Sequence, residues 1–149
     1  MIKGGDCMKK TLMLALLTLF IISGCSSSET EDDKNKGLEF SNYQYGIGSI
    51  DNTDTFDRQK LQYDVTISNK QKTKLKKESV EIVLTDWINE KQTDNKITEI
   101  NFNNDNINIK GYVIFYTKGL TKEQILSNEP FINGVKVVTD LGMEILIKQ

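Results

Sequence analysis

Apolar and polar side chains alternate without a break in Leu61-Gln62-Tyr63-Asp64-Val65-Thr66-Ile67-Ser68. Successive side chains of a β-strand point to opposite faces of the sheet, so this pattern predicts a strand with one buried face. The same period of two recurs on both sides of this stretch. It predicts six further strands, at Leu38–Ile47, Val80–Trp87, Ile97–Phe102, Ile107–Phe115, Val135–Thr139 and Met143–Ile147.

Residues that favour turns separate several of these strands. The polar run 103–106 and the segment 140–142 each predict a turn between antiparallel neighbours. Asn133 and Gly134 predict another tight turn, immediately before the sixth strand. Pro130, the single proline, lies outside every predicted strand.

One short helix is predicted among the strands. Thr121 and Gln124 have the spacing of a capping box, flanked by Leu120 and Ile125 as a hydrophobic staple, which indicates a helix over 121–127. Seven strands and one short helix favour a mainly β fold, a seven-stranded antiparallel immunoglobulin-like β-sandwich over residues 38–149. The inter-sheet disulfide typical of antibody domains is missing.

The N-terminal segment is typical of an export signal. Two lysines, Lys9 and Lys10, precede an apolar run over 11–22 that is too short for the ~20 residues a membrane span needs. The run ends in Ile22, Ser23, Gly24 and Cys25, which resemble the lipobox of bacterial lipoproteins. We therefore expect residues 1–24 to be a signal peptide, begun at Met1 or Met8, and Cys25 to be lipidated.

Lipidation of Cys25 would place the protein on the extracytoplasmic face of the cell membrane. Two or more acyl chains, at ~0.8 kcal/mol per buried methylene, give firm anchoring. The alternative is that Cys25 remains a free thiol beside an ordinary secretory cleavage site. Residues 26–37 contain no aliphatic or aromatic side chain, so we expect residues 25–37 to form a disordered tether with a reach of roughly 20 Å.

Composition excludes several classes of function. The chain has no histidine, and Cys7 would leave with the signal, so the usual ligands for transition metals and most nucleophile–base pairs are missing. We expect no cofactor and no enzyme activity. The net charge of about −4 expected after loss of residues 1–24 gives no general attraction to nucleic acid.

The lipobox, the polar tether and two strand segments together resemble a known group of proteins. The strand segments are residues 63–69 and residues 110–115. The chain is similar to uncharacterised Gram-positive lipoproteins that carry immunoglobulin-like, telokin-like domains. This resemblance implies a small sandwich facing the cell envelope and assigns no functional residue.

Two charged segments are candidate binding sites. An extended lysine-rich segment would point several of its charges one way, toward an anionic polymer such as teichoic acid or toward anionic headgroups. The alternative is a solvated loop whose lysines block aggregation. These lysines are Lys70, Lys72, Lys74, Lys76 and Lys77.

The second charged segment contains three acids, Asp51, Asp54 and Asp57, which suggest a weak calcium site. Their spacing does not match an EF-hand, so a polar loop is the favoured interpretation and no metal is predicted.

Aromatic residues give a further candidate surface. Tyr112 and Tyr116 have the parity opposite to Val113 and Phe115, so we expect them to be exposed and able to contact a peptide or a sugar. Trp87 and Tyr63 are expected in the core instead. The other tyrosines considered are Tyr43 and Tyr45.

The sequence as a whole favours a membrane-anchored, non-enzymatic binding or accessory module of the cell envelope. Its partner would be an envelope protein or an anionic polymer, contacted through a face, a loop or an open edge strand. The alternative is an immunity or stress-accessory lipoprotein that sequesters a toxin or a partner enzyme. A hydrolase using Glu78, Glu81 or Glu129 is disfavoured, because no pattern places two of these acids together.

Overall fold

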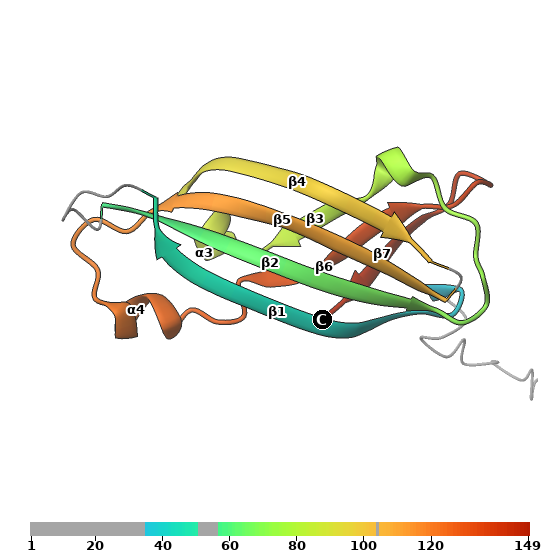
Figure 1. Ribbon diagram of the computed structural model, residues 1–149, viewed down its shortest axis with the longest axis horizontal. Helices are drawn as coiled ribbons and strands as arrows, with labels where there is room; N and C mark the ends of the chain where they lie inside the picture. Colours follow the sequence, from blue (N-terminus) through green and yellow to red (C-terminus); the bar gives the residue numbers. More distant parts are fainter. Residues whose placement is uncertain (1–34, 51–56, 104) are drawn as a thin grey trace, which may run out of the picture.

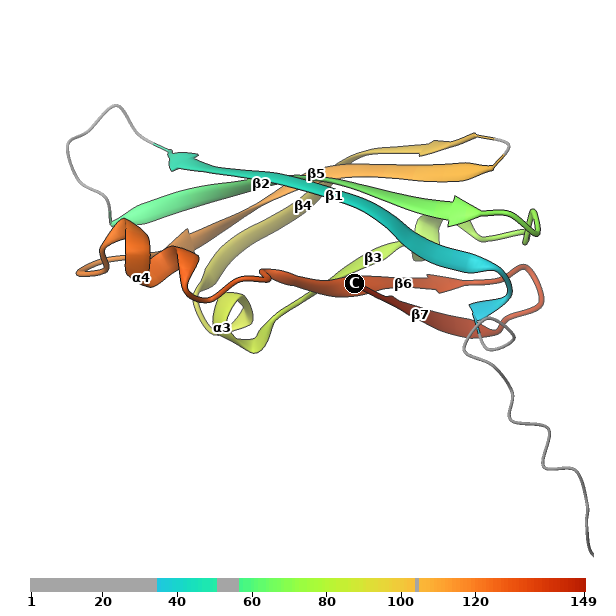
Figure 2. The ribbon, with the colours of Figure 1, turned by 90° about the horizontal axis from the view of Figure 1, so that it is seen from below.

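Two antiparallel sheets pack face to face in the computed structural model, which describes residues 35–50, 57–103 and 105–149. Figures 1 and 2 show the two layers, with the longer strands in one and the shorter strands in the other. The strands are β1 (Leu38–Ser49), β2 (Arg58–Asn69), β3 (Glu81–Leu84), β4 (Gln92–Phe102), β5 (Asn106–Tyr116), β6 (Ile132–Val138) and β7 (Glu144–Lys148). The helical segments are η1 (Lys77–Ser79), α3 (Asp86–Asn89) and α4 (Lys122–Leu126).

The strand order within the sheets is β1-β2-β5-β4 in one and β3-β6-β7 in the other. Lettered A to G along the chain, these are the ABED and CFG sheets of a constant-type immunoglobulin domain. The predicted immunoglobulin-like β-sandwich is therefore confirmed for the described residues.

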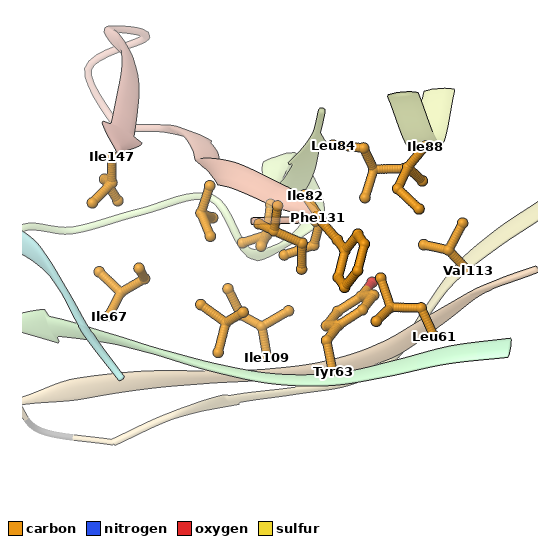
Figure 3. Close-up of a cluster of buried hydrophobic side chains, with 14 of the residues drawn as sticks. Leu61, Tyr63, Ile67, Ile82, Leu84, Ile88, Ile109, Val113, Phe131 and Ile147 are labelled. Carbon is orange, nitrogen blue, oxygen red and sulfur yellow. The ribbon is translucent and has the colours of Figure 1, made fainter. Parts of the chain in front are cut away.

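The core lies between the inner faces of the two sheets. Leu61, Val65 and Ile67 of β2 are buried there, as the period of two predicts. Figure 3 shows side chains of the two layers meeting, with Leu61 and Ile67 on one side and Ile82 and Ile147 on the other. Burial of each such aliphatic side chain contributes roughly 1.5–3 kcal/mol relative to exposure.

Three local predictions are wrong. The third strand does not run to Trp87, because the chain turns into α3 after Leu84. β4 begins at Gln92 instead of Ile97. It is one of the two edge strands of its sheet, mostly exposed and interrupted by bulges, so its first half carries no alternating pattern.

The third error concerns Asn133 and Gly134, which lie inside β6 and do not form a turn. Gly134 pairs with Val83 on one side and with Lys148 on the other. A β-carbon at Gly134 would collide with the backbone carbonyl oxygen of Ile147. Glycine is needed here for close strand approach, and sequence alone does not distinguish that need from a turn.

Tyr63 occupies the inner face of β2 directly opposite Gly111 of β5. The tyrosine ring lies over the space that a side chain at position 111 would fill. The Tyr63 hydroxyl is buried and has no hydrogen-bond partner among the described residues. Burial raises the pKa of Tyr63 to about 12.

We expect Tyr63→Phe to raise the free energy of unfolding by about 1 kcal/mol near neutral pH, because it removes a buried, unpaired hydroxyl. The wild type should also lose stability as pH rises from about 10 towards 12. Over that range the unfolded chain ionises Tyr63 first, so high pH favours unfolding. This loss should be smaller in the variant.

Urea unfolding at pH values between neutral and about 11 measures both effects. Tyr116→Phe is the control, because Tyr116 is 55% exposed. A variant less stable than the wild type at neutral pH would contradict the assignment of an unpaired hydroxyl.

Candidate functional site

A cleft opens between the end of β1 and the short helix α4. Its volume is about 510 Å³, within the range of ligand pockets. The walls are mainly apolar. The principal lining side chains are Ile47 from β1, Gln59 from β2, and Leu120, Lys122, Ile125 and Leu126 in and beside α4.

The predicted capping box of α4 is present and fixes one wall of the cleft. The Gln124 backbone N–H donates to Thr121 Oγ1 at 3.3 Å, and the Thr121 N–H donates to Gln124 Oε1 at 2.8 Å. Ile125 anchors the helix because it is buried in the core, whereas Leu126 is 37% exposed at the cleft. A partner can therefore reach Leu126 without displacing the helix.

Three aromatic residues form a cluster beside the cleft. Tyr43 and Tyr45 stack with ring centroids 5.3 Å apart, and Tyr45 meets Phe131 edge-on at 5.4 Å. Tyr43, Tyr45 and Ile47 alternate along β1 and pair with inward-facing residues of β2. The inner face of β1 thus presents one continuous apolar row that ends in the cleft.

Glu129 joins this cluster to the segment that follows α4. The Tyr45 hydroxyl donates a hydrogen bond to Glu129 Oε1. This bond, followed by burial and the carboxylate charge, raises the pKa of Tyr45 to about 12. Burial, with smaller effects of Tyr45 and Glu129, also raises the pKa of Tyr43. Both phenols are neutral at physiological pH and offer hydroxyl groups, not charges.

The outer face of the larger sheet carries the two predicted contact residues, Tyr112 and Tyr116. Tyr116 is exposed as expected. Tyr112 is half-buried: its hydroxyl donates to Asp94 Oδ2 at 3.1 Å, and Lys60 Nζ lies 4.3 Å from its ring centroid. The hydrogen bond to Asp94 raises its pKa. These tyrosines lie on the opposite face of the sheet from the cleft.

The other aromatic candidates contribute to packing. Tyr63 is buried as predicted. Trp87 is half-buried in α3 and packs against the rings of Phe115 and Phe131 at 5.8 and 6.2 Å. Lys91 Nζ lies 5.2 Å from the Trp87 ring centroid.

The five candidate lysines lie in the connection between β2 and β3, residues 70–77, which we call the lysine loop. All five are exposed. The loop is not extended throughout, because residues 70 and 71 form a turn and Lys72 has a left-handed φ of 53°. Lys70 pairs with Glu39 at 2.7 Å, and Lys77 Nζ lies 5.2 Å from the Phe102 ring centroid.

Several candidates fall on residues that the structure does not describe. The lipobox Ile22–Cys25, Asp51 and Asp54 lie outside the described ranges; Asp57 is described and exposed. Within residues 35–50, 57–103 and 105–149, no group of three potential ligands from His, Cys, Asp and Glu could hold a metal ion. The three acids considered for hydrolysis lie on separate segments: Glu78 in η1, Glu81 in β3 and Glu129 after α4.

The cleft and the Tyr45–Glu129 pair were not predicted as a site. The capping-box signal does predict α4, and the staple residues Leu120 and Ile125 both prove to line the cleft. What the sequence lacks is any signal that places α4 beside the end of β1. The two segments come together only in the tertiary structure.

The described part of the chain defines an immunoglobulin-like β-sandwich with an apolar cleft at one end. Comparison with protein-family models, with curated protein sequences and with solved structures gives no match to the chain. No helix among the described residues is both long enough and apolar enough to cross a membrane.

Proposed function

We propose that the protein is a lipid-anchored, non-enzymatic binding module of the cell envelope, which binds an extended segment of a partner protein. The cleft between β1 and α4 carries this proposal. An apolar side chain of the partner would fill the cleft between Ile47 and Leu126. The anchor at Cys25 is supported by the lipobox pattern of the sequence.

The edge strand β1 supports an extended partner. Among the described strands β1 pairs only with β2, so its other edge is open in the sheet. Residues 40–49 contain no charge and no proline, and Ile47, Gly48 and Ser49 line the cleft directly. A partner strand added at this edge would gain backbone hydrogen bonds, while the cleft would select its side chain.

The opposite edge of the same sheet, strand β4, is charged and irregular. β4 carries Asp94, Lys96 and Glu99, and its pairing with β5 is interrupted by two bulges. Charges and bulges are the features by which edge strands resist pairing with another chain. β1, whose pairing with β2 is irregular only between Phe40 and Asn42, is the edge that can accept a strand.

The same geometry accommodates the immunity or stress-accessory function. A toxin or an enzyme that inserts an extended segment beside β1 would be held in a stoichiometric complex. A repeating polymer would not require an uncharged strand edge.

We expect Leu126→Asp to reduce recovery of the partner complex at least tenfold, because it places a carboxylate in the apolar cleft. A photo-reactive residue at Lys122 measures this recovery in cells. Leu146→Asp is the matched control, since Leu146 of β7 is 44% exposed and lies outside the cleft. Both variants should keep the wild-type stability within about 1 kcal/mol.

Two further readouts make the experiment specific. The wild-type complex should contain one partner in stoichiometric yield, and its formation should slow amide exchange in residues 44–48 of β1. Equal recovery from Leu126→Asp and Leu146→Asp, or unchanged exchange in β1, would overturn the proposal.

A further inference from the structure

The chain enters the sandwich at the same end as the lysine loop. Figures 1 and 2 place the start of β1, the β2–β3 connection and the β6–β7 hairpin together at one end, with α4 at the other. We call the end that holds the start of β1 the entry end. It comprises residues 35–38, 70–80 and 139–143. The cleft therefore lies at the far end of the long axis from the entry end.

Three contacts hold the lysine loop against the entering chain. Thr73 Oγ1 donates to the Lys36 carbonyl oxygen at 2.7 Å. The Gln71 side chain occupies the space beside Gly37, which has a positive φ of 70°. The ion pair between Lys70 and Glu39 adds a third contact. The loop and the entry point thus form one surface.

Buried Asn69 gives the lysine loop a fixed shape. Its Nδ2 donates to the Thr73 carbonyl oxygen at 3.0 Å, and its Oδ1 accepts from the Thr73 N–H at 2.8 Å. The β6–β7 hairpin braces the loop from the other side. The Lys76 N–H donates to the Val138 carbonyl oxygen at 2.9 Å. The Asp140 N–H donates to the Lys74 carbonyl oxygen at 3.0 Å.

The entry end has a local excess of positive charge, although the whole chain is net negative. Its cations are Lys36 and the five lysines of the lysine loop. Two acids lie within it, Glu78 and Asp140, and the described acids beside it include Glu39, which pairs with Lys70, Glu99 and Asp105. Residues 29–33, which precede it in sequence, carry four further acids. Within the entry end itself lysines outnumber acids by six to two, which favours contact with an anionic surface.

We propose that the entry end docks on the anionic lipid surface of the membrane and so holds the cleft away from the bilayer. This inference rests on the proposed lipid anchor. Cys25 precedes Lys36 by eleven residues, which gives a reach of roughly 20 Å between the acyl chains and the lysine loop. Each lysine near an anionic leaflet contributes roughly 1 kcal/mol of attraction, and salt screens that attraction.

The test uses the lipidated protein purified from the membrane fraction and placed in vesicles of zwitterionic lipid, with or without an anionic phospholipid. A water-soluble amine acetylating reagent then labels accessible lysines, and mass spectrometry reads each site. We expect labelling of Lys72, Lys74 and Lys76 to fall about threefold or more on anionic vesicles. Labelling of Lys122, at the cleft end, should not change.

Two conditions identify the charge of the lipid surface as the cause of this protection. The protection should disappear at about 0.5 M salt. Soluble polyglycerol phosphate added to zwitterionic vesicles should not reproduce it, and protection by that polymer would overturn the choice of lipid as the partner. Equal labelling in both kinds of vesicle would overturn docking itself.

The same samples distinguish this inference from the proposed function. The mass of the N-terminal peptide reports directly whether Cys25 is acylated, and an unmodified thiol would overturn the anchor and the docking together. The Leu126→Asp variant should show the wild-type labelling pattern, because its substitution lies at the cleft end. Loss of partner binding without loss of lysine protection is therefore the expected behaviour of that variant.

Discussion

Phe131→Ala should lower the free energy of unfolding by about 4 kcal/mol, because removing a fully buried phenylalanine leaves a cavity that its neighbours fill only in part. Phe131 has no exposed surface and contacts the rings of Tyr45 and Trp87. Figure 3 shows it pointing from the smaller layer toward Tyr63 of the larger one. The loss is a large part of the ~5–15 kcal/mol available to a domain.

Thermal unfolding followed by circular dichroism should show the midpoint falling by about 20 °C. Tyr116→Ala provides the control, since it also deletes an aromatic ring but from an exposed position. That variant should lie within about 1 kcal/mol of the wild type. Similar losses in the two variants would contradict the placement of Phe131 at the centre of the core.

Gly111→Ala should destabilise the fold by about 3 kcal/mol, the upper part of the range for overpacking a core. The added β-carbon would lie 2.5 Å from the backbone carbonyl oxygen of Lys96 and in contact with the Tyr63 hydroxyl. The tyrosine can move only by displacing other core side chains, and the carbonyl belongs to the neighbouring strand β4. Both β4 and β5 must therefore shift.

Urea unfolding of Gly111→Ala and Gly46→Ala compares a crowded glycine with an open one. A β-carbon at Gly46 meets no atom within 4 Å, so this control should change stability by no more than about 0.5 kcal/mol. Equal losses in the free energy of unfolding would contradict this prediction. They would show that the loss at position 111 comes from restricting the backbone and not from contact with Tyr63 and Lys96.

Most of the fold could be predicted because its strands bury one face and expose the other. β2 and β5 occupy the middle of the larger sheet, so their alternation is regular and their predicted limits lie within a few residues of the observed ones. The pattern fails for β4, whose two faces are both largely exposed. It also fails at Gly134, where backbone crowding, and not a turn, requires glycine.

The candidate site was less predictable than the fold. The exposure of Tyr116 and the capping box of α4 are local properties and were predicted from the spacing of neighbouring residues. The cleft joins Ile47 to Leu126, and Tyr45 bonds to Glu129 across a similar separation in sequence. Such pairs depend on the packing of α4 against β1, which the hydrophobic pattern of the sequence does not predict.

β1 connects the entry end to the cleft as a single strand of twelve residues. A pull applied between these two ends acts along the axis of β1, whereas its hydrogen bonds to β2 run perpendicular to that axis. Since the tether and the partner would both attach to β1, its covalent backbone would carry the force, and the hydrogen bonds between β1 and the partner strand would be loaded together in shear. A partner strand bound along β1 would thus pull against the proposed tether without opening the pairing between β1 and β2.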